Sequence, residues 1–157
     1  MEAENLETGA STFFTTDHAR CDELWARVES SVEANDTKRA LGNWRAFDAA
    51  TRRHLAMEEE VIFPALDEAT GMRGRGPVAV MRHEHAQMRA LLDHMGVLAD
   101  GRDLRGVLDQ GDSLMMLIQQ HNAKEEGVLY PMVDAALGPV WPRLAARLAT
   151  YREIDPS

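Results

Sequence analysis

Residues 54–64 read HLAMEEEVIFP, and residues 121–131 read HNAKEEGVLYP. Both stretches begin with a histidine, continue with paired glutamates one helical turn later, and end in an aromatic residue followed by proline. Positions four apart lie on the same face of an α-helix. Each stretch therefore directs an imidazole and a carboxylate to the same side of a helix. Two such helices facing each other would provide two histidines and two glutamates to one metal site.

Apolar residues recur at three- and four-residue steps through four long segments and one short one, which is typical of amphipathic helices. These segments are residues 12–33, 37–69, 77–99, 103–136 and 141–152. Asp36 or Thr37 is expected to cap the second helix. No segment alternates with the period of two that strands require. We therefore predict an all-α fold, an up-down-up-down four-helix bundle with a short extra C-terminal helix. The bundle domain is expected to span residues 12–152, after a disordered N-terminal tail of residues 1–11.

The bulk composition excludes several classes of partner. A net charge of −9 argues against binding to nucleic acid or to an anionic membrane surface. No apolar run approaches the roughly 20 residues of a membrane span. The lone cysteine, Cys21, excludes an internal disulfide, and the acidic start MEAENLETGA lacks the layout of a signal peptide. A cytoplasmic protein is expected, of unknown oligomeric state.

Each of the four long segments carries a histidine on its apolar stripe, and two of them add a glutamate one turn later. Imidazole nitrogens and carboxylate oxygens together suit iron, zinc or manganese. A buried carboxylate costs several kcal/mol unless it is paired or binds a cation. Glu58 and Glu125 are the best candidates to bridge two adjacent cations. A metal-free network of protonated histidines and glutamates is the alternative compensation.

Helical phase separates the remaining histidines from this group. His83 and His85 differ by about 200° of helix rotation, so both cannot face the interior. His85 shares its face with apolar residues, and we expect it to point inward. His94 shares the outward face of His83, and both are expected to be solvated.

Other polar residues near the repeated stretches are expected to have lesser roles. Glu59 and Glu126 are expected at the surface or holding a ligand imidazole, and together with Asp22 they are left open as additional ligands. Cys21 is interpreted as a small core residue. Tyr130, the counterpart of Phe63 in the repeat, is expected to pack in the core.

With these residues the chain resembles the hemerythrin-like, or HHE cation-binding, family over about residues 12–136. The resemblance rests on the doubled His-x-x-x-Glu-Glu stretches, on Glu84-His85, and on one histidine in the first helix. It implies a four-helix bundle around a non-haem site of two iron ions, oxo- or hydroxo-bridged, with zinc or manganese as substitutes. Carried over by position, the expected metal ligands are His18, His54, Glu58, His85, His121 and Glu125. The ferritin-like Glu-x-x-His pattern fits worse, because no histidine here has a glutamate three residues before it.

The resemblance also implies a function, and the chain departs from the pattern of one group of family members. Family members bind O₂, sense O₂, NO or redox state, or handle iron. Oxygen carriers have a fifth histidine one turn from that of the third helix, where this chain has Met81 and Arg89. A di-iron enzyme acting on peroxide or nitric oxide is the alternative, as is a mononuclear-metal or metal-free interaction module. A binding protein is favoured over an enzyme.

Overall fold

The computed structural model describes residues 9–153, and every element within that range is helical. The elements are α2 (Ala10–Glu33), α3 (Thr37–Met57), η1 (Glu58–Ile62), α4 (Phe63–Thr70), α5 (Gly76–Asp100), α6 (Leu104–Lys124), η2 (Glu125–Leu129), α7 (Tyr130–Leu137), η3 (Gly138–Val140) and α8 (Trp141–Glu153). The all-α prediction is confirmed. The two segments expected as single helices, 37–69 and 103–136, are each interrupted by a π-helical turn, η1 and η2.

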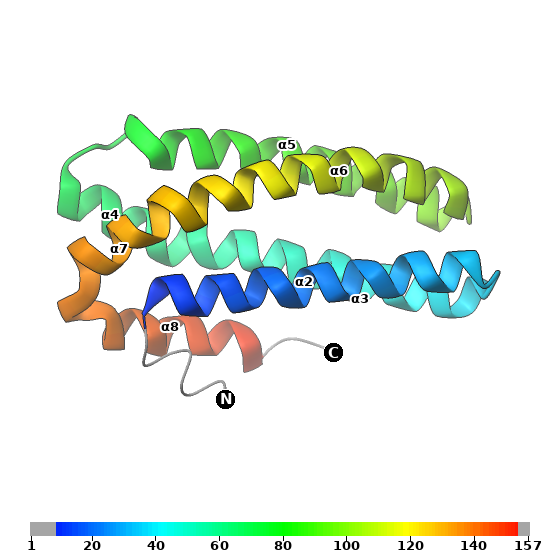
Figure 1. The fold of residues 1–157 in the computed structure, drawn as a ribbon, viewed down its shortest axis with the longest axis horizontal. Helices are drawn as coiled ribbons and strands as arrows, with labels where there is room; N and C mark the ends of the chain where they lie inside the picture. The colour runs from blue at the N-terminus through cyan, green and yellow to red at the C-terminus, as the bar shows by residue number, and fades with distance from the viewer. Residues whose placement is uncertain (1–8, 154–157) are drawn as a thin grey trace.

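The long helices pack as two pairs that share one interior. Helix α2 packs along α3, and α5 packs along α6, and the two pairs lie one above the other in Figure 1. Contacts between α2 and α6, α2 and α7, and α3 and α5 close the space between the pairs. Helix α8 packs against α3 and η1. The arrangement is a helical bundle whose interior receives side chains from every long helix.

Aspartates begin two of the long helices. Asp36 accepts a hydrogen bond from the backbone N–H three residues on at 3.1 Å, and Asp103 does the same at 2.9 Å. Such caps satisfy a backbone donor that has no partner within the helix and contribute about 1 kcal/mol each. Of the two caps considered for the second helix, Asp36 is the one observed.

Buried apolar side chains form two clusters along the bundle. The α8-end cluster includes Phe13, Phe14, Phe63, Met81, Leu129, Trp141 and Leu144. The loop-end cluster includes Trp25, Trp44, Phe47, Met88, Leu92, Leu114 and Ile118. Each long helix crosses from one cluster to the other at a buried histidine; on α2, for example, His18 lies between Phe14 and Trp25. The apolar core is therefore divided by a buried polar layer.

Gly111 has a packing role in the loop-end cluster. Glycine in a helix costs about 1 kcal/mol relative to alanine, so the sequence makes Gly111 a weak point of α6. A Cβ atom built at Gly111 would overlap the indole ring of Trp25. The missing side chain lets α2 approach α6 closely at this level.

The first helix begins earlier than expected. Residues 1–8 of the expected tail lie outside the described residues, but Ala10 and Ser11 already belong to α2. The Asp134 carboxylate accepts hydrogen bonds from their backbone N–H groups at 2.8 and 3.4 Å. An acidic side chain at a helix N-terminus supplies acceptors to unpaired donors and interacts favourably with the helix dipole. This contact comes from a residue far away in sequence, so the local sequence pattern does not reveal it.

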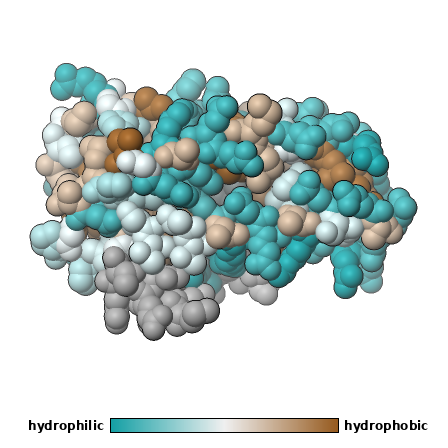
Figure 2. Space-filling view, viewed as in Figure 1, coloured by the Kyte–Doolittle hydropathy of each residue, from teal (hydrophilic) through white to brown (hydrophobic). Residues whose placement is uncertain are grey.

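The surface is mostly polar. Figure 2 shows a largely hydrophilic face with a few apolar side chains among the polar ones. The large apolar side chains exposed in the described part of the chain are Met72, Val80, Val97, Met116 and Val128. None of the described helices is long and apolar enough to cross a membrane.

Candidate metal centre

Both repeated glutamates begin a π-helical turn. The backbone N–H of Phe63 bonds to the carbonyl of Glu58, and that of Tyr130 bonds to the carbonyl of Glu125, five residues earlier in each case. A proline directly follows each aromatic residue. Proline has no N–H to donate and crowds the carbonyl four residues earlier, which disfavours a continuous α-helix there. Single π-turns of this kind frequently occur at functional sites.

The structure brings all six expected ligand residues together in the polar layer. All are buried, with exposures of 0 to 6%. They are His18 (α2), His54 (α3), Glu58 (η1), His85 (α5), His121 (α6) and Glu125 (η2). Each long helix therefore provides at least one side chain to the same small volume.

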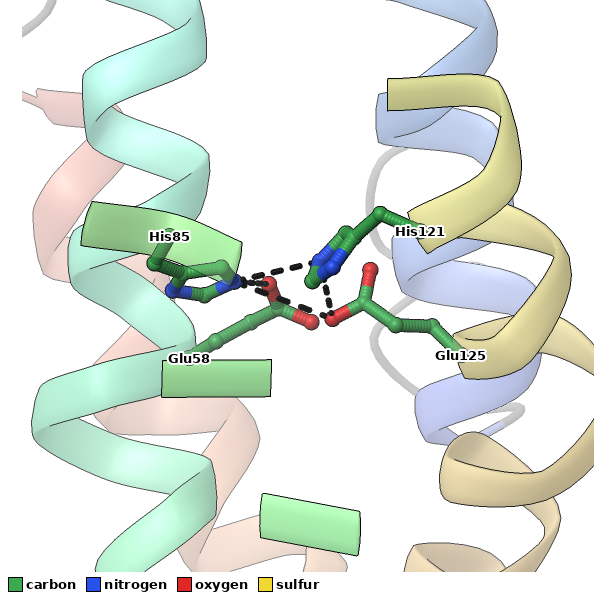
Figure 3. Close-up of side chains that lie close together, drawn as sticks. All are labelled: Glu58, His85, His121 and Glu125. Carbon is green, nitrogen blue, oxygen red and sulfur yellow. Dashed lines mark hydrogen bonds and ion pairs between the residues drawn. The ribbon is translucent and has the colours of Figure 1, made fainter. Parts of the chain in front are cut away.

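The side chains form two groups that share a carboxylate. Subsite A consists of His18, His54 and Glu125, and subsite B consists of Glu58, His85, His121 and Glu125. Within each group, one donor atom from every residue lies within 4.8 Å of all the others. Figure 3 shows subsite B, in which the two imidazoles face each other beside the two carboxylates.

The Glu125 carboxylate faces both subsites. Its Oε1 lies 3.1 Å from His18 Nε2, and its Oε2 lies 3.1 Å from His121 Nε2. Glu58 is similarly placed, because its Oε1 lies 3.4 Å from His54 Nε2 and 3.3 Å from His85 Nε2. Each glutamate therefore has a histidine of both subsites within reach, which is the arrangement that a carboxylate bridging two cations requires.

A carboxylate holds the outer nitrogen of every histidine in the centre. Each Nδ1 lies 2.7 or 2.8 Å from a carboxylate oxygen on a neighbouring helical segment. The pairs are His54 with Asp17, His85 with Glu59, His121 with Glu84, and His18 with Glu126. Every one of these carboxylates is the sequence neighbour of a residue in the centre. The four hydrogen bonds therefore form a closed ring around the bundle.

This ring sets the tautomers of the imidazoles. An ionised carboxylate only accepts, so each Nδ1 carries the proton and donates it. In a neutral imidazole the lone pair of Nε2 then points toward the centre, as in the carboxylate–histidine–metal arrangement of known metal sites. The Nε2 atoms of His85 and His121 lie only 3.2 Å apart. Two lone pairs at that distance require a cation or a shared proton between them.

Two carboxylate oxygens of the centre lack a hydrogen-bond donor in the described part of the chain. Glu58 Oε1 and Glu125 Oε2 are fully buried and have no hydrogen-bond partner among the described residues, although ring nitrogens lie 3.1 to 3.4 Å away. A buried anionic oxygen without a partner is strongly disfavoured. Nitrogen and oxygen donors that converge on two orphaned anionic oxygens fit a divalent or trivalent cation.

The charges of the centre favour positive species within it. Burial lowers the pKa of His54, but Glu58 and Asp17 offset this and hold it well above its ordinary value of 6.5. Burial also lowers the pKa of His85, whereas Glu58 and Glu59 raise it to about 8. Burial raises the pKa of the Glu58 carboxyl, and His54 above all holds it well below its ordinary value. Protons and metal ions therefore compete for the same nitrogen and oxygen atoms.

Comparison with known proteins agrees with this geometry. The hemerythrin HHE cation binding domain matches residues 10–133, which is most of the chain. The chain belongs to the hemerythrin HHE cation-binding family. A curated relative, the iron-sulfur cluster repair protein YtfE of Edwardsiella ictaluri (strain 93-146), is 30% identical over 95 residues. The match covers 55% of this chain and 42% of that protein, so this chain spans less than half of the relative's length. No solved structure matches the chain.

Tyr130 takes part in this hemerythrin-like centre, contrary to the expectation of packing alone. It is fully buried, and its ring stacks on that of Phe14. Its hydroxyl lies 2.8 Å from Glu58 Oε2 and 2.9 Å from Glu125 Oε1. Residues five apart differ by about 140° on an α-helix, but the π-turn brings Tyr130 back toward Glu125. Burial and the two carboxylates raise the pKa of the phenol well above its ordinary value of 10. Without a metal ion the phenol therefore keeps its proton and donates a hydrogen bond.

Neither subsite includes four other residues with possible donor atoms, His83, His94, Asp22 and Cys21. His83 and His94 are exposed, in agreement with the helical phase. Asp22 is exposed and makes no contact with a donor atom that would place it in either subsite. Cys21 is partly buried, and burial above all raises the pKa of its thiol to about 11, so it stays protonated.

The carboxylate ring contains two residues to which sequence reasoning gave no role. Asp17 and Glu84 each immediately precede a ligand histidine. Glu59 and Glu126 were expected to hold imidazoles or to lie at the surface, and both hold imidazoles. An acidic residue next to four of the six candidate ligands, His18, Glu58, His85 and Glu125, was the signal available in the sequence. The partner that each carboxylate binds lies on another helix, and sequence proximity does not specify it.

The positions of the fifth histidine of oxygen carriers have other roles. Met81 is buried in the α8-end cluster. Arg89 donates to Glu59 Oε2 at 2.6 Å, and the same oxygen accepts from His85 Nδ1. Arg89 therefore holds a carboxylate of the ring and does not face the centre.

A small apolar cavity adjoins the centre. Its volume is about 20 Å³, and residues of both subsites line it together with apolar side chains. The lining includes His18, His54, His121, Phe47, Met88 and Ile118. A space of this size holds one small molecule such as water. A diatomic gas is of similar size and less polar.

Proposed function

We propose that this protein binds two iron ions in the polar layer of an up-down-up-down four-helix bundle with a short extra C-terminal helix. The bundle domain is taken to span residues 12–152. The proposed ligands are the six residues carried over from the family, with His18 and His54 serving one ion and His85 and His121 the other. Glu58 and Glu125 would serve both, because each lies near a histidine of both subsites. Zinc or manganese could occupy the same donors, because availability decides among metals of similar preference.

One observation carries this proposal above the metal-free alternative. Glu58 Oε1 and Glu125 Oε2 are buried without a hydrogen-bond partner, while the Nδ1 protons of all four imidazoles are engaged on the outer side. A network of protonated histidines would be expected to donate to these two oxygens. A pair of cations satisfies them and the four Nε2 lone pairs together.

The proposed role is to react with or sense O₂, NO or redox state, or to handle iron. Iron bound here would supply one-electron chemistry and affinity for diatomic ligands. Four imidazoles and two shared carboxylates provide fewer donors than two octahedral ions hold, so exchangeable positions remain. The apolar cavity beside His18, His54 and His121 could hold a diatomic molecule next to them.

The relative supports a connection with iron rather than a defined reaction. That protein is named for iron-sulfur cluster repair, and this chain matches less than half of its length. A part in iron handling or repair is therefore a proposal for this chain. The cytoplasmic location expected from the sequence also stays a prediction.

Metal analysis tests the proposal. Protein purified without chelator or affinity metal is titrated anaerobically with ferrous iron, and bound iron is counted after removal of excess. Saturation near two ions per chain supports the two-ion centre. Saturation at one ion reduces it to a mononuclear site, and uptake that never exceeds traces rejects it.

Reaction with gases distinguishes the roles. The reduced, iron-loaded protein is mixed with O₂ or NO in a stopped-flow spectrometer. We expect rapid reaction with O₂ that ends in oxidised iron, because the nitrogen ligand present in oxygen carriers is replaced by Met81 or Arg89. A coloured adduct that persists for hours and releases O₂ under vacuum would instead identify a carrier. Sustained consumption of peroxide or NO over many turnovers would identify the enzyme alternative.

A further inference from the structure

The Tyr130 hydroxyl lies among the donor atoms around subsite A. Its oxygen is 3.1 Å from His18 Nε2 and 3.5 Å from His54 Nε2. It is also 2.8 Å from Glu58 Oε2 and 2.9 Å from Glu125 Oε1. All four neighbours belong to the residues proposed as metal ligands.

These separations are those of ligands around one ion. Bonds from nitrogen or oxygen to a metal of this kind are about 2.1 Å long, so adjacent ligands of an octahedral ion lie about 3 Å apart. The phenol oxygen is at about this distance from four donor atoms at once. An oxygen at one corner of an octahedron has the same relation to its four neighbouring corners.

Hydrogen bonding alone does not account for the position of the phenol. The hydroxyl has one proton, which it donates to one acceptor at a time. The two glutamate oxygens accept only, and in neutral imidazoles the two Nε2 atoms direct lone pairs inward, because the Nδ1 protons are engaged on the outer side. Four electron-rich atoms around one O–H group leave a shortage of positive charge that a metal ion in the same place would remove.

The internal repeat shows that this oxygen is specific to one half of the centre. The counterpart of Tyr130 is Phe63, which follows the same π-turn and lies against His85 of subsite B. Subsite B thus has an aromatic ring without a donor atom where Tyr130 provides one. The two halves of the centre share their histidine and glutamate pattern and differ in this oxygen.

We propose that Tyr130 is a ligand of the ion bound at subsite A. The phenol oxygen forms a bond to the ion, its O–H bond breaks, and the proton leaves to solvent. No electron is transferred. With Glu58 and Glu125 both shared as proposed, subsite A then has five donor residues and subsite B four, so the two ions differ in their ligands. This inference rests on the proposed two-iron centre and adds a ligand to it.

Resonance Raman spectroscopy of the oxidised, iron-loaded protein tests the inference without an activity assay. A phenolate bound to ferric iron gives a visible charge-transfer band, and excitation in that band enhances vibrations of the tyrosine ring. The chain has two tyrosines, Tyr130 and Tyr151. Tyr151 lies on α8, where its hydroxyl donates to Glu60, so Tyr151→Phe is the matched control.

We expect the tyrosine ring vibrations in the wild type and in Tyr151→Phe, and their complete loss in Tyr130→Phe. Ring-deuterated tyrosine shifts the bands in Tyr151→Phe, where Tyr130 is the sole tyrosine. That measurement decides the question even if Tyr130→Phe does not fold. Two bound irons without tyrosine vibrations, or vibrations that persist in Tyr130→Phe, overturn the inference and leave the two-iron proposal standing. Failure to bind iron overturns both.

Discussion

Asp17 offers a sharp test of the carboxylate ring because its environment is the most enclosed. It is 1% exposed, and its Oδ2 accepts the His54 Nδ1 proton at 2.7 Å. Its Oδ1 faces the guanidinium groups of Arg20, Arg53 and Arg152 at 3.8 to 3.9 Å. Burial raises the pKa of the Asp17 carboxyl, but His54, Arg53 and Arg152 lower it overall, so the group is ionised.

The substitution Asp17→Asn keeps the size of the side chain and removes its charge. If the new carbonyl accepts from His54, the amide donors turn toward three cationic groups. If the amide turns inward, the imidazole loses its acceptor. In both cases His54 becomes a less basic and less well-oriented ligand. Loss of such a partner lowers metal affinity 10- to 100-fold in known sites, or about 1.4 to 2.8 kcal/mol.

The assay is a competitive titration of ferrous iron against a chromophoric chelator under anaerobic conditions. Asp48→Asn is the matched control, because Asp48 also pairs with an arginine, Arg52, but touches no histidine of the centre. Thermal unfolding of each variant without metal separates a loss of affinity from a loss of fold. Equal affinity in wild type and Asp17→Asn, or an equal loss in Asp48→Asn, would refute the proposed role of the ring.

Three further outcomes are expected. His85→Ala lowers metal occupancy whereas His83→Ala does not, and elemental analysis of the two variants checks the inward phase of α5. Gly111→Ala decreases the free energy of unfolding by up to about 2 kcal/mol, because overpacking against Trp25 costs about 1 to 3 kcal/mol against a helical gain of about 1 kcal/mol. Gly96→Ala, with no atom within 4 Å of its new Cβ, is stabilising by about 1 kcal/mol. A denaturant titration of both glycine variants measures the two changes in the free energy of unfolding. Metal at 100 times its dissociation constant stabilises the fold by about 2.7 kcal/mol if it does not bind the unfolded chain, and identical melting of apo and metal-loaded protein would contradict this.

The helices and the six converging residues followed from local sequence patterns. A histidine and a glutamate four apart share a helix face regardless of the rest of the fold, so His54 with Glu58 and His121 with Glu125 were paired correctly. The stripe of α5 likewise distinguished His85 from its exposed neighbour. Periods of three and four residues carry this information because regular helices have a fixed rotation per residue.

The polar role of Tyr130 did not follow from the same patterns. Its packing role was inferred from its alignment with Phe63 in the repeat, whereas the π-turn brings its hydroxyl to the centre. The repeated proline indicated a disturbance of the helix but not its kind. A π-turn depends on how the chain resolves a local conflict within the packed bundle, which a fixed period does not describe.

The carboxylate ring could be predicted only in part from the sequence. An acidic residue beside four of the six candidate ligands is visible in the sequence, as in Asp17-His18 and Glu84-His85. The hydrogen bonds themselves cross between helices, for example from His54 to Asp17 and from His121 to Glu84. Such pairs depend on the order and offset of neighbouring helices, which become known only when the helices are packed. The contact of the Asp134 carboxylate with the first residues of α2 is hidden from the sequence for the same reason.

The central claim is that two metal ions share the Glu58 and Glu125 carboxylates in one centre. Electron paramagnetic resonance of the fully oxidised protein, loaded with iron and measured near liquid-helium temperature, tests this most directly. Bridged ferric ions couple antiferromagnetically, so we predict two irons per chain with almost no ferric signal. A signal of isolated high-spin ferric ions that accounts for all the bound iron would contradict the account.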